Sequence, residues 1–147
     1  MTYDIILNLP GWESTIEEFT DVSGAEITHL EASDRQTSSG VDIYLGPMPD
    51  GETAEDQAFA NYAETVGFDD DDEDCPIFKF KFNGRNAWGF EAYADNDQPM
   101  RFFAQEVRKG LLSIVVVSSE TDKRLLEVVG LLEKNLRIKS KESGSDR

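Results

Sequence analysis

The 147-residue chain has little of three residue classes on which binding and catalysis often depend: one cysteine, one histidine and few basic side chains. The single Cys75 excludes an intramolecular disulfide framework. One His and one Cys also fall short of the nitrogen and sulfur ligands of a zinc site. No apolar run approaches the roughly 18 residues that a membrane span requires. We therefore expect no zinc centre, no cofactor and no transmembrane segment.

Basic residues are scarce, with 14 Lys and Arg against 30 Asp and Glu, for a net charge of −16. Residues 1–75 contain 20 acidic side chains and only Arg35 as a base, whereas residues 76–147 contain 13 basic and 10 acidic side chains. Nucleic-acid binding depends on Lys and Arg, and anionic lipid surfaces repel negative charge. Nucleic acid and membrane are therefore disfavoured as partners. The acidic half suits a basic protein or a cation, although the charge would also serve solubility alone.

The hydrophobic share of 39% is enough to form one compact core. We expect a single α+β domain over residues 1–138, followed by a polar, flexible tail over 139–147. The N-terminal sequence MTYDIILNLPGWE has no basic leader and no small-residue cleavage site. We accordingly expect the protein to be cytoplasmic.

In the first half, alternating apolar residues predict strands over 2–9, 25–32 and 41–48. Ser14 and Glu17 have the spacing of a helix capping box, which predicts a short helix over 15–20. A longer helix is predicted from Thr53 to about Val66. Its first turn has an N-cap with its N3 acid, Thr53 and Asp56, and its apolar residues recur at steps of three and four.

The second half predicts four consecutive strands over 76–83, 86–94, 99–107 and 111–119, joined by short turns that include Asn83-Gly84. The last strand, LLSIVVVSS, is apolar enough to be a buried central strand. A helix over 120–136, capped by Ser119 with Asp122, closes the domain. The fold class is α+β: an antiparallel meander of about five to seven strands, packed with a mid-chain helix and a C-terminal helix.

Most aromatic side chains fall in this meander, and two readings of them remain open. Phe102 and Phe103 are adjacent in one strand, so they must point to opposite faces of the sheet. Helices on both faces, or ring pairs across strands, would bury the rings. If helices cover only one face, exposed rings would instead form a surface for a partner or a second copy.

The order of elements resembles the PsbP-like fold. The resemblance rests on VDIYLGPM, the helix ETAEDQAFANYAETV, the meander from Ile77 to Ser118 and the closing helix ETDKRLLEVVGLLEKNL. It covers roughly residues 2–138 and consists of element order and hydrophobic pattern. Members of this family include photosystem II extrinsic proteins and a nuclear import factor that binds the GTPase Ran. The resemblance implies a binding or assembly domain rather than an enzyme.

The most conspicuous candidate site is the acidic run Asp69, Asp70, Asp71, Asp72, Glu73 and Asp74. Three interpretations are open: a solvated loop, a contact surface for a basic partner, or a weak calcium or magnesium site. An EF-hand loop is excluded, because its sixth and twelfth positions would be Asp74 and Phe80 rather than Gly and Glu.

Catalytic constellations are hard to find in the sequence. His29 lies in a weak strand without a nucleophile elbow, so it is interpreted as a structural or surface residue. Acidic neighbours should raise the pKa of Cys75 and make it inert. Glu91 and Glu106 on adjacent strands are a remote candidate pair for acid–base chemistry. Neither of the two phosphate-binding glycine motifs occurs.

The sequence therefore predicts a non-enzymatic, acidic binding or assembly domain that contacts a basic protein partner. Its candidate partner-binding residues are the six acids from Asp69 to Asp74. The alternative is a protein that binds a divalent cation through the same run.

Overall fold

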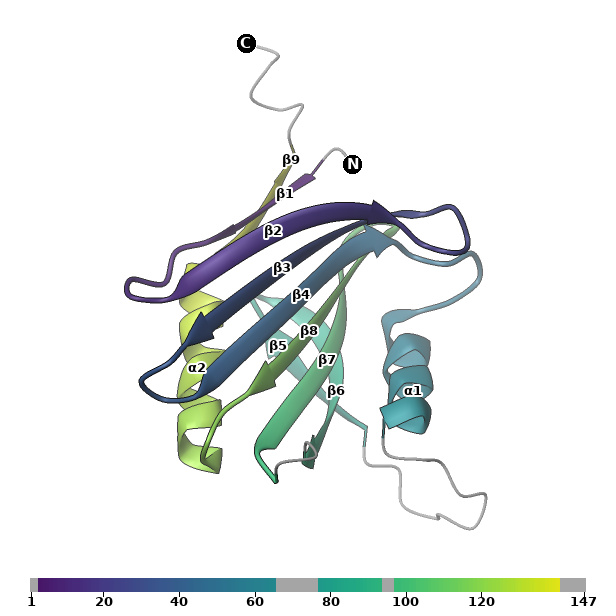
Figure 1. Cartoon of the computed structure of the whole chain (residues 1–147). Helices are drawn as coiled ribbons and strands as arrows, with labels where there is room; N and C mark the ends of the chain where they lie inside the picture. The colour runs from purple at the N-terminus through teal and green to yellow at the C-terminus, as the bar shows by residue number, and fades with distance from the viewer. Residues whose placement is uncertain (1–2, 66–76, 94–96, 141–147) are drawn as a thin grey trace.

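The computed structural model describes residues 3–65, 77–93 and 97–140 (Figure 1). The predicted partner-binding run Asp69–Asp74 and its neighbour Cys75 lie outside these residues. The elements, in chain order, are β1 (Tyr3–Leu7), β2 (Glu13–Thr20), β3 (Glu26–Asp34), β4 (Ser39–Pro47), α1 (Ala54–Thr65), β5 (Phe78–Phe82), β6 (Arg85–Tyr93), β7 (Pro99–Arg108), β8 (Leu111–Ser118), α2 (Asp122–Asn135) and β9 (Leu136–Ser140).

Seven strands form one antiparallel sheet in the order β2-β3-β4-β8-β7-β6-β5. The predicted α+β class with an antiparallel meander and two helices is therefore confirmed. Strand β8 lies in the middle of the sheet, as its apolar sequence predicts, and it joins the β2–β4 part to the β5–β7 part. The hairpin between β5 and β6 turns at Asn83 and Gly84, both with positive φ, as expected for this dipeptide.

The short helix predicted over 15–20 is wrong, because this segment is part of strand β2. The capping-box spacing had only two apolar residues to support it, Ile16 and Phe19. In β2 these side chains lie opposite Leu30 and Ile27 of β3, on the two different faces of the sheet. β-Branched residues such as Thr15 and Ile16 also favour an extended backbone. Pairing with β3 therefore outweighs the local helix pattern.

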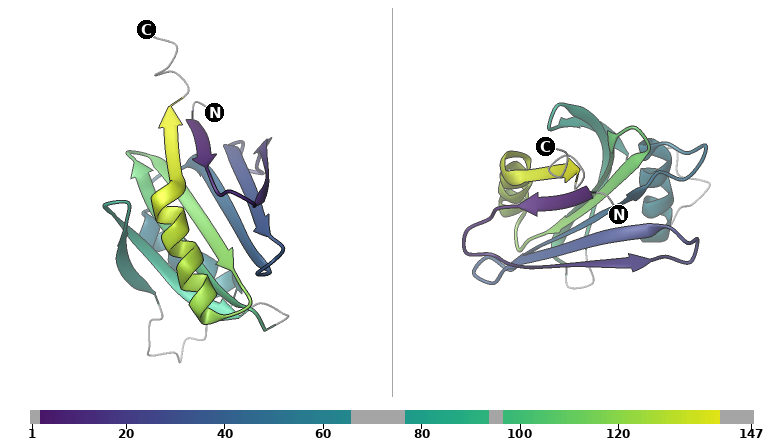
Figure 2. Two further views of the ribbon diagram at one scale, coloured as in Figure 1. Left: turned by 90° about the vertical axis from the view of Figure 1, so that its left-hand side faces the viewer. Right: turned by 90° about the horizontal axis from the view of Figure 1, so that it is seen from above.

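The inner face of the sheet is covered by α2 and by a separate two-stranded ribbon of β1 and β9 (Figure 2). Leu125, Val128 and Leu132 of α2 are fully buried in a core that also contains residues of β3, β4 and β8. The predicted helix cap was misplaced by two residues, because Thr121, not Ser119, accepts from the Arg124 backbone N–H, at 3.1 Å.

Strand β9 was not predicted. The chain leaves α2 at Leu136, and residues up to Ser140 pair with β1, so that Ile138 lies opposite Ile5. This partner is more than 130 positions away in the sequence, which is why no local pattern indicated the strand. Strand β9 consequently includes residues 139 and 140, the first two of the predicted tail.

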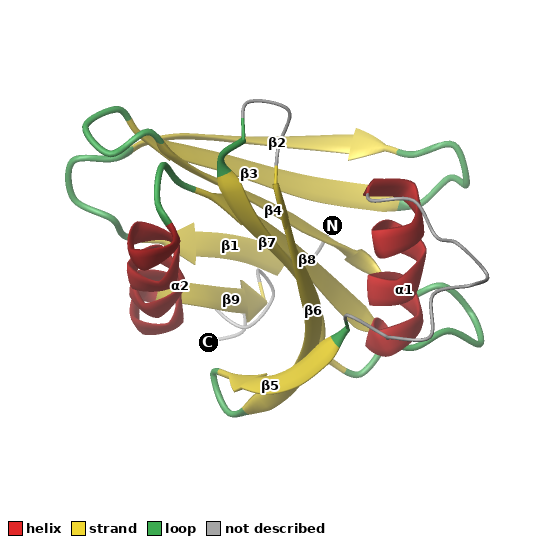
Figure 3. Cartoon of the chain, turned by 90° about the horizontal axis from the view of Figure 1, so that it is seen from below, coloured by secondary structure: helices red, strands yellow, loops and turns green. Residues whose placement is uncertain are grey.

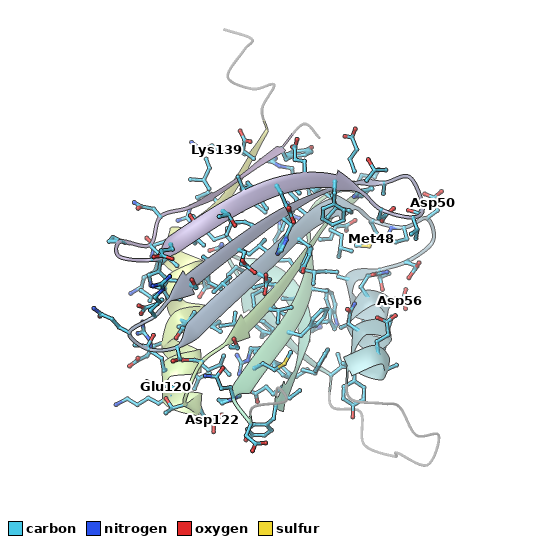
Figure 4. The ribbon with its side chains drawn as sticks, in the orientation of Figure 1. Met48, Asp50, Asp56, Glu120, Asp122 and Lys139 are labelled. Atoms are coloured by element: carbon cyan, nitrogen blue, oxygen red, sulfur yellow. The ribbon has the colours of Figure 1, made fainter. Side chains whose placement is uncertain are left out.

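Helix α1 packs on the opposite face, over β6 and β7. Phe90 and Phe102 stack there with ring centroids 4.9 Å apart, and Tyr62 of α1 meets Phe90 edge-on. Met48, labelled in Figure 4, packs against the same cluster. Figure 3 shows the two helices apart, with strands of the sheet between them. Helices therefore cover both faces of the sheet, and this explains why most aromatic rings of the meander are buried or half-buried.

The first turn of α1 has the predicted reciprocal cap. The Thr53 backbone N–H donates to the Asp56 carboxylate at 2.9 Å, and the Asp56 N–H donates to the Thr53 hydroxyl at 3.2 Å. Among the described residues, no helix is long and apolar enough to cross a membrane.

Candidate functional site

Helix α1 packs over β6 and β7. It leaves the outer surface of β2, β3 and β4 uncovered, and this surface faces the viewer in Figure 1. Strand alternation and register determine which side chains point outwards here. We call this surface the acidic face; it consists of Glu13, Thr15, Glu17, Phe19, Ile27, His29, Glu31, Ser33, Asp42 and Tyr44. It displays four carboxylates. One basic residue of the described chain, Arg35, approaches it, with a guanidinium nitrogen 3.7 Å from Glu13.

His29 is at the centre of the acidic face. Its Nε2 lies 2.8 Å from Asp42 Oδ1 and its Nδ1 lies 3.4 Å from Glu17 Oε1. The imidazole is stacked on the Tyr44 ring, with centroids 4.3 Å apart and planes 5° apart. This row follows from register, because Glu17, His29 and Tyr44 lie opposite one another on β2, β3 and β4. The His29 side chain is only 15% exposed.

The acids around His29 change its titration. Burial of the ring disfavours the charged form, but hydrogen bonds to Asp42 and Glu17 and their negative charges outweigh it, so the pKa of His29 is raised. The pKa of Tyr44 is also raised, by burial and then by the charges of Asp42, Glu31 and Glu17. A phenol with a raised pKa forms little phenolate at neutral pH. Tyr44 is therefore not activated as a nucleophile beside the His29–Asp42 pair.

Glu31 completes the acidic face. It lies opposite Asp42 of β4 on one side and Thr15 of β2 on the other. Neighbouring carboxylates on one sheet surface attract a lysine or arginine more strongly than any one of them alone. Within the described residues no group of three His, Cys, Asp or Glu side chains is arranged to hold a metal ion.

The structure does not bring together the two glutamates considered for acid–base chemistry. Glu91 lies opposite Arg101 and forms an ion pair with it at 3.0 Å. Glu106 is five residues further along β7, where it accepts a hydrogen bond from the Gly110 N–H at 3.0 Å. Each carboxylate therefore has a structural partner of its own.

Sequence reasoning missed the importance of His29. The alternation of β3 would have placed His29 and Glu31 on one side of a strand. Because residues 15–20 were predicted to be a helix, Glu17 was not assigned to the sheet. Its position beside His29 could therefore not be predicted. The Asp42 contact depends on the register between β3 and β4, which no local pattern specifies.

Two cavities are lined by more than one arginine, and these two cavities differ in charge balance. One, of about 480 Å³, lies between the β2–β3 end of the sheet and α2. Each of its two arginines has a carboxylate partner: Arg35 lies 3.7 Å from Glu13, and Arg124 lies 3.5 Å from Asp34. The other, of about 520 Å³, lies just past the C-terminal end of α2, against the first residues of β9, and three arginines line it.

Comparisons with protein families, curated proteins and solved structures found no match to this chain. The resemblance to the PsbP-like fold therefore stays a prediction. Any proposal of function depends on the chain's own residues and their geometry.

Proposed function

We propose that this chain is a non-enzymatic protein-binding domain whose acidic face receives a basic, extended segment of a partner protein. The observation that carries this proposal is the uncovered outer surface of β2, β3 and β4, where Glu13, Glu17, Glu31 and Asp42 surround the stacked rings of His29 and Tyr44. Carboxylates there provide attraction and specificity for Lys and Arg, and the rings provide apolar contact area.

The position of β2 supports an extended partner. β2 is the first strand of the sheet and, within the described chain, pairs with β3 only. All eight of its residues are exposed, including Ile16 at 53%. An exposed sheet edge is a template on which a peptide can add as a further strand. The acidic side chains of β2 favour a peptide with lysine or arginine over an acidic one.

Enzymatic and cation-binding functions have less support. His29 pairs with carboxylates on both ring nitrogens, and neither nitrogen has a hydroxyl or thiol of the described chain beside it. The cation alternative depends on Asp69–Asp74, which lie outside the described residues. That run also remains a candidate for contact with the same basic partner.

Zero-length carbodiimide crosslinking in lysate at low salt tests the proposal, because it joins carboxylates directly to lysines. We expect a partner crosslinked through Glu13, Glu17 or Glu31. The triple variant Glu13→Gln, Glu17→Gln, Glu31→Gln should lose this product. A matched control on exposed residues elsewhere, Glu55→Gln, Glu64→Gln, Glu120→Gln, makes the same change in net charge and should keep it.

A third variant separates the two acidic surfaces. It carries Asn in place of the five aspartates of the 69–74 run. Loss of the partner in this variant alone would transfer the binding role from the acidic face to the run. Failure to capture any partner at low salt would contradict the binding function itself.

A further inference from the structure

The cavity of about 520 Å³ lies beneath the start of β9, on the inner side of the sheet at the ends of β5, β6 and β7. It is on the side of the sheet away from the acidic face. Its lining includes Arg85, Arg108 and Arg137 and no acidic side chain. The chain has only 14 basic residues and a net charge of −16. Three arginines around one cavity are therefore a large share of the positive charge of this chain.

None of these three arginines forms an ion pair with a carboxylate of the described chain. Their hydrogen bonds go to backbone carbonyls: Arg85 to Glu106 at 3.5 Å, Arg108 to Ile138 at 3.5 Å, and Arg137 to Glu133 at 3.3 Å and to Leu136 at 2.7 Å. The Arg108 guanidinium also lies over the Tyr3 ring, 5.7 Å from its centroid. Carbonyl contacts orient a guanidinium without cancelling its charge. The cavity accordingly keeps up to three positive charges available to a ligand.

Two glutamates near the cavity have carboxylates that accept hydrogen bonds from backbone N–H groups and form no ion pair with the three arginines. The Glu133 carboxylate accepts from the Asn83 backbone N–H at 2.9 Å, and the Glu106 carboxylate accepts from the Gly110 N–H at 3.0 Å. In the first cavity, by contrast, both arginines form ion pairs, with Glu13 and Asp34.

The remainder of the lining combines a polar floor with apolar walls. Gln105 is 4% exposed, and its side-chain amide donates to the carbonyls of Phe82 and Arg85 at 2.7 and 3.1 Å. Ser113, 3% exposed, lies opposite Gln105. Phe82, Val107, Leu136 and Ile138 supply apolar surface. A bare inorganic anion would leave these walls without contacts.

We propose that this cavity binds a small organic anion, with a carboxylate or phosphate head held by Arg85, Arg108 and Arg137 and an apolar body against Phe82, Val107 and Ile138. Arginine forks match both head groups in geometry and charge. The apolar body gains affinity by leaving water. This site is independent of the acidic face and of the partner proposed for it.

Calorimetric titration of the full chain with octanoate, octan-1-ol and inorganic phosphate tests the site. We expect octanoate to bind with a Kd on the order of 0.1–1 mM. Octan-1-ol and phosphate should each bind at least about tenfold more weakly, because each lacks one half of the recognised chemistry. Amide resonances of Gln105 and Ser113 should shift at lower concentrations of octanoate than of octan-1-ol or phosphate.

Arg108→Gln and Arg85→Gln should each weaken octanoate binding about tenfold or more. Arg35→Gln removes the same charge outside the cavity and should leave the Kd within about twofold. Thermal melting of each variant verifies that it is folded. If a Gln variant does not fold, Arg108→Lys replaces it: this variant keeps the positive charge and should retain partial affinity for octanoate. No saturable octanoate binding, equal binding of octanol or phosphate, or an equal loss in Arg35→Gln would overturn the proposal.

Discussion

His29 shows how one residue reports on the electrostatics of a whole surface. It is the only histidine of the chain, and it stands between Glu17 and Asp42 with its ring on Tyr44. Protonated His29 offsets one negative charge of the acidic face, and neutral His29 leaves that face fully acidic. The ionisation of a single ring therefore adjusts the charge that a basic partner meets.

The raised pKa of His29 makes part of the folding stability depend on pH. The folded state binds the proton more tightly than the unfolded state, whose pKa is about 6.5. This stabilisation is fully present below about pH 6.5 and is lost as pH rises through the higher folded pKa. We expect wild type to exceed His29→Gln in unfolding free energy by more at pH 5.5 than at pH 8.5.

Urea unfolding of both proteins at the two pH values measures this difference. Loss of the stack on Tyr44 should lower the unfolding free energy of the variant by the same amount at both pH values. It therefore does not produce a pH-dependent difference. A gap that stays constant or widens towards pH 8.5 would show that His29 is not stabilised by its acidic neighbours when charged.

Two glycines have opposite roles that the sequence alone does not distinguish. A Cβ at Gly89 of β6 would overlap the Phe102 carbonyl oxygen and lie 3.0 Å from Phe103 Cβ, whereas a Cβ at Gly130 of α2 would meet nothing within 4 Å. We expect Gly89→Ala to lower the unfolding free energy by about 1–3 kcal/mol. Gly130→Ala should raise it by about 0.5–1 kcal/mol. Chemical denaturation verifies both signs; equal effects would contradict the packing of β6 against β7.

Among the elements, the meander and both longer helices were predictable because their patterns are long and locally consistent. PIFKFKFN, the Asn83-Gly84 turn and LLSIVVVSS each specify a strand or a turn without help from distant residues. β2 and β9 were not predictable in this way. β2 has few apolar residues and depends on β3 for its conformation, and β9 depends on β1 at the other end of the chain.

Helix α2 is expected to contribute to stability through one stripe of side chains. Leu132 is fully buried against the sheet, and Leu126 on the same helix is 55% exposed. Leu132→Ala should cost about 2–5 kcal/mol because it leaves a cavity in the core. Leu126→Ala should stay within about 0.5 kcal/mol. Comparable losses in guanidinium unfolding would contradict the orientation of α2.

The candidate sites were less predictable than the elements. The acidic half was evident from composition, but the placement of four of its carboxylates on one sheet surface depends on strand order and register. Arg85, Arg108 and Arg137 are spread over about 50 positions of sequence, and only the docking of β9 beneath the sheet end brings them to one cavity. Such clusters arise from tertiary contacts and have no local sequence pattern.

On the scale of the whole molecule, the net charge of −16 has two opposite consequences. Like charges in the acidic half repel one another, so added salt should stabilise the folded state by screening them. The same screening should weaken the binding of a basic partner to the acidic face. We expect the melting temperature to rise between about 0.05 and 0.5 M NaCl while partner affinity falls. A melting temperature that falls with salt would show that attractive ion pairs dominate the surface.

The central claim is that the acidic face of β2, β3 and β4 binds a basic extended segment. The most direct test is a nuclear magnetic resonance titration of the isotopically labelled chain with a peptide of alternating Lys and Thr. We predict that amide shifts concentrate in these three strands. The triple variant Glu13→Gln, Glu17→Gln, Glu31→Gln should bind about tenfold more weakly than the control variant at Glu55, Glu64 and Glu120. Shifts centred on other elements, or equal affinities of the two variants, would contradict the claim.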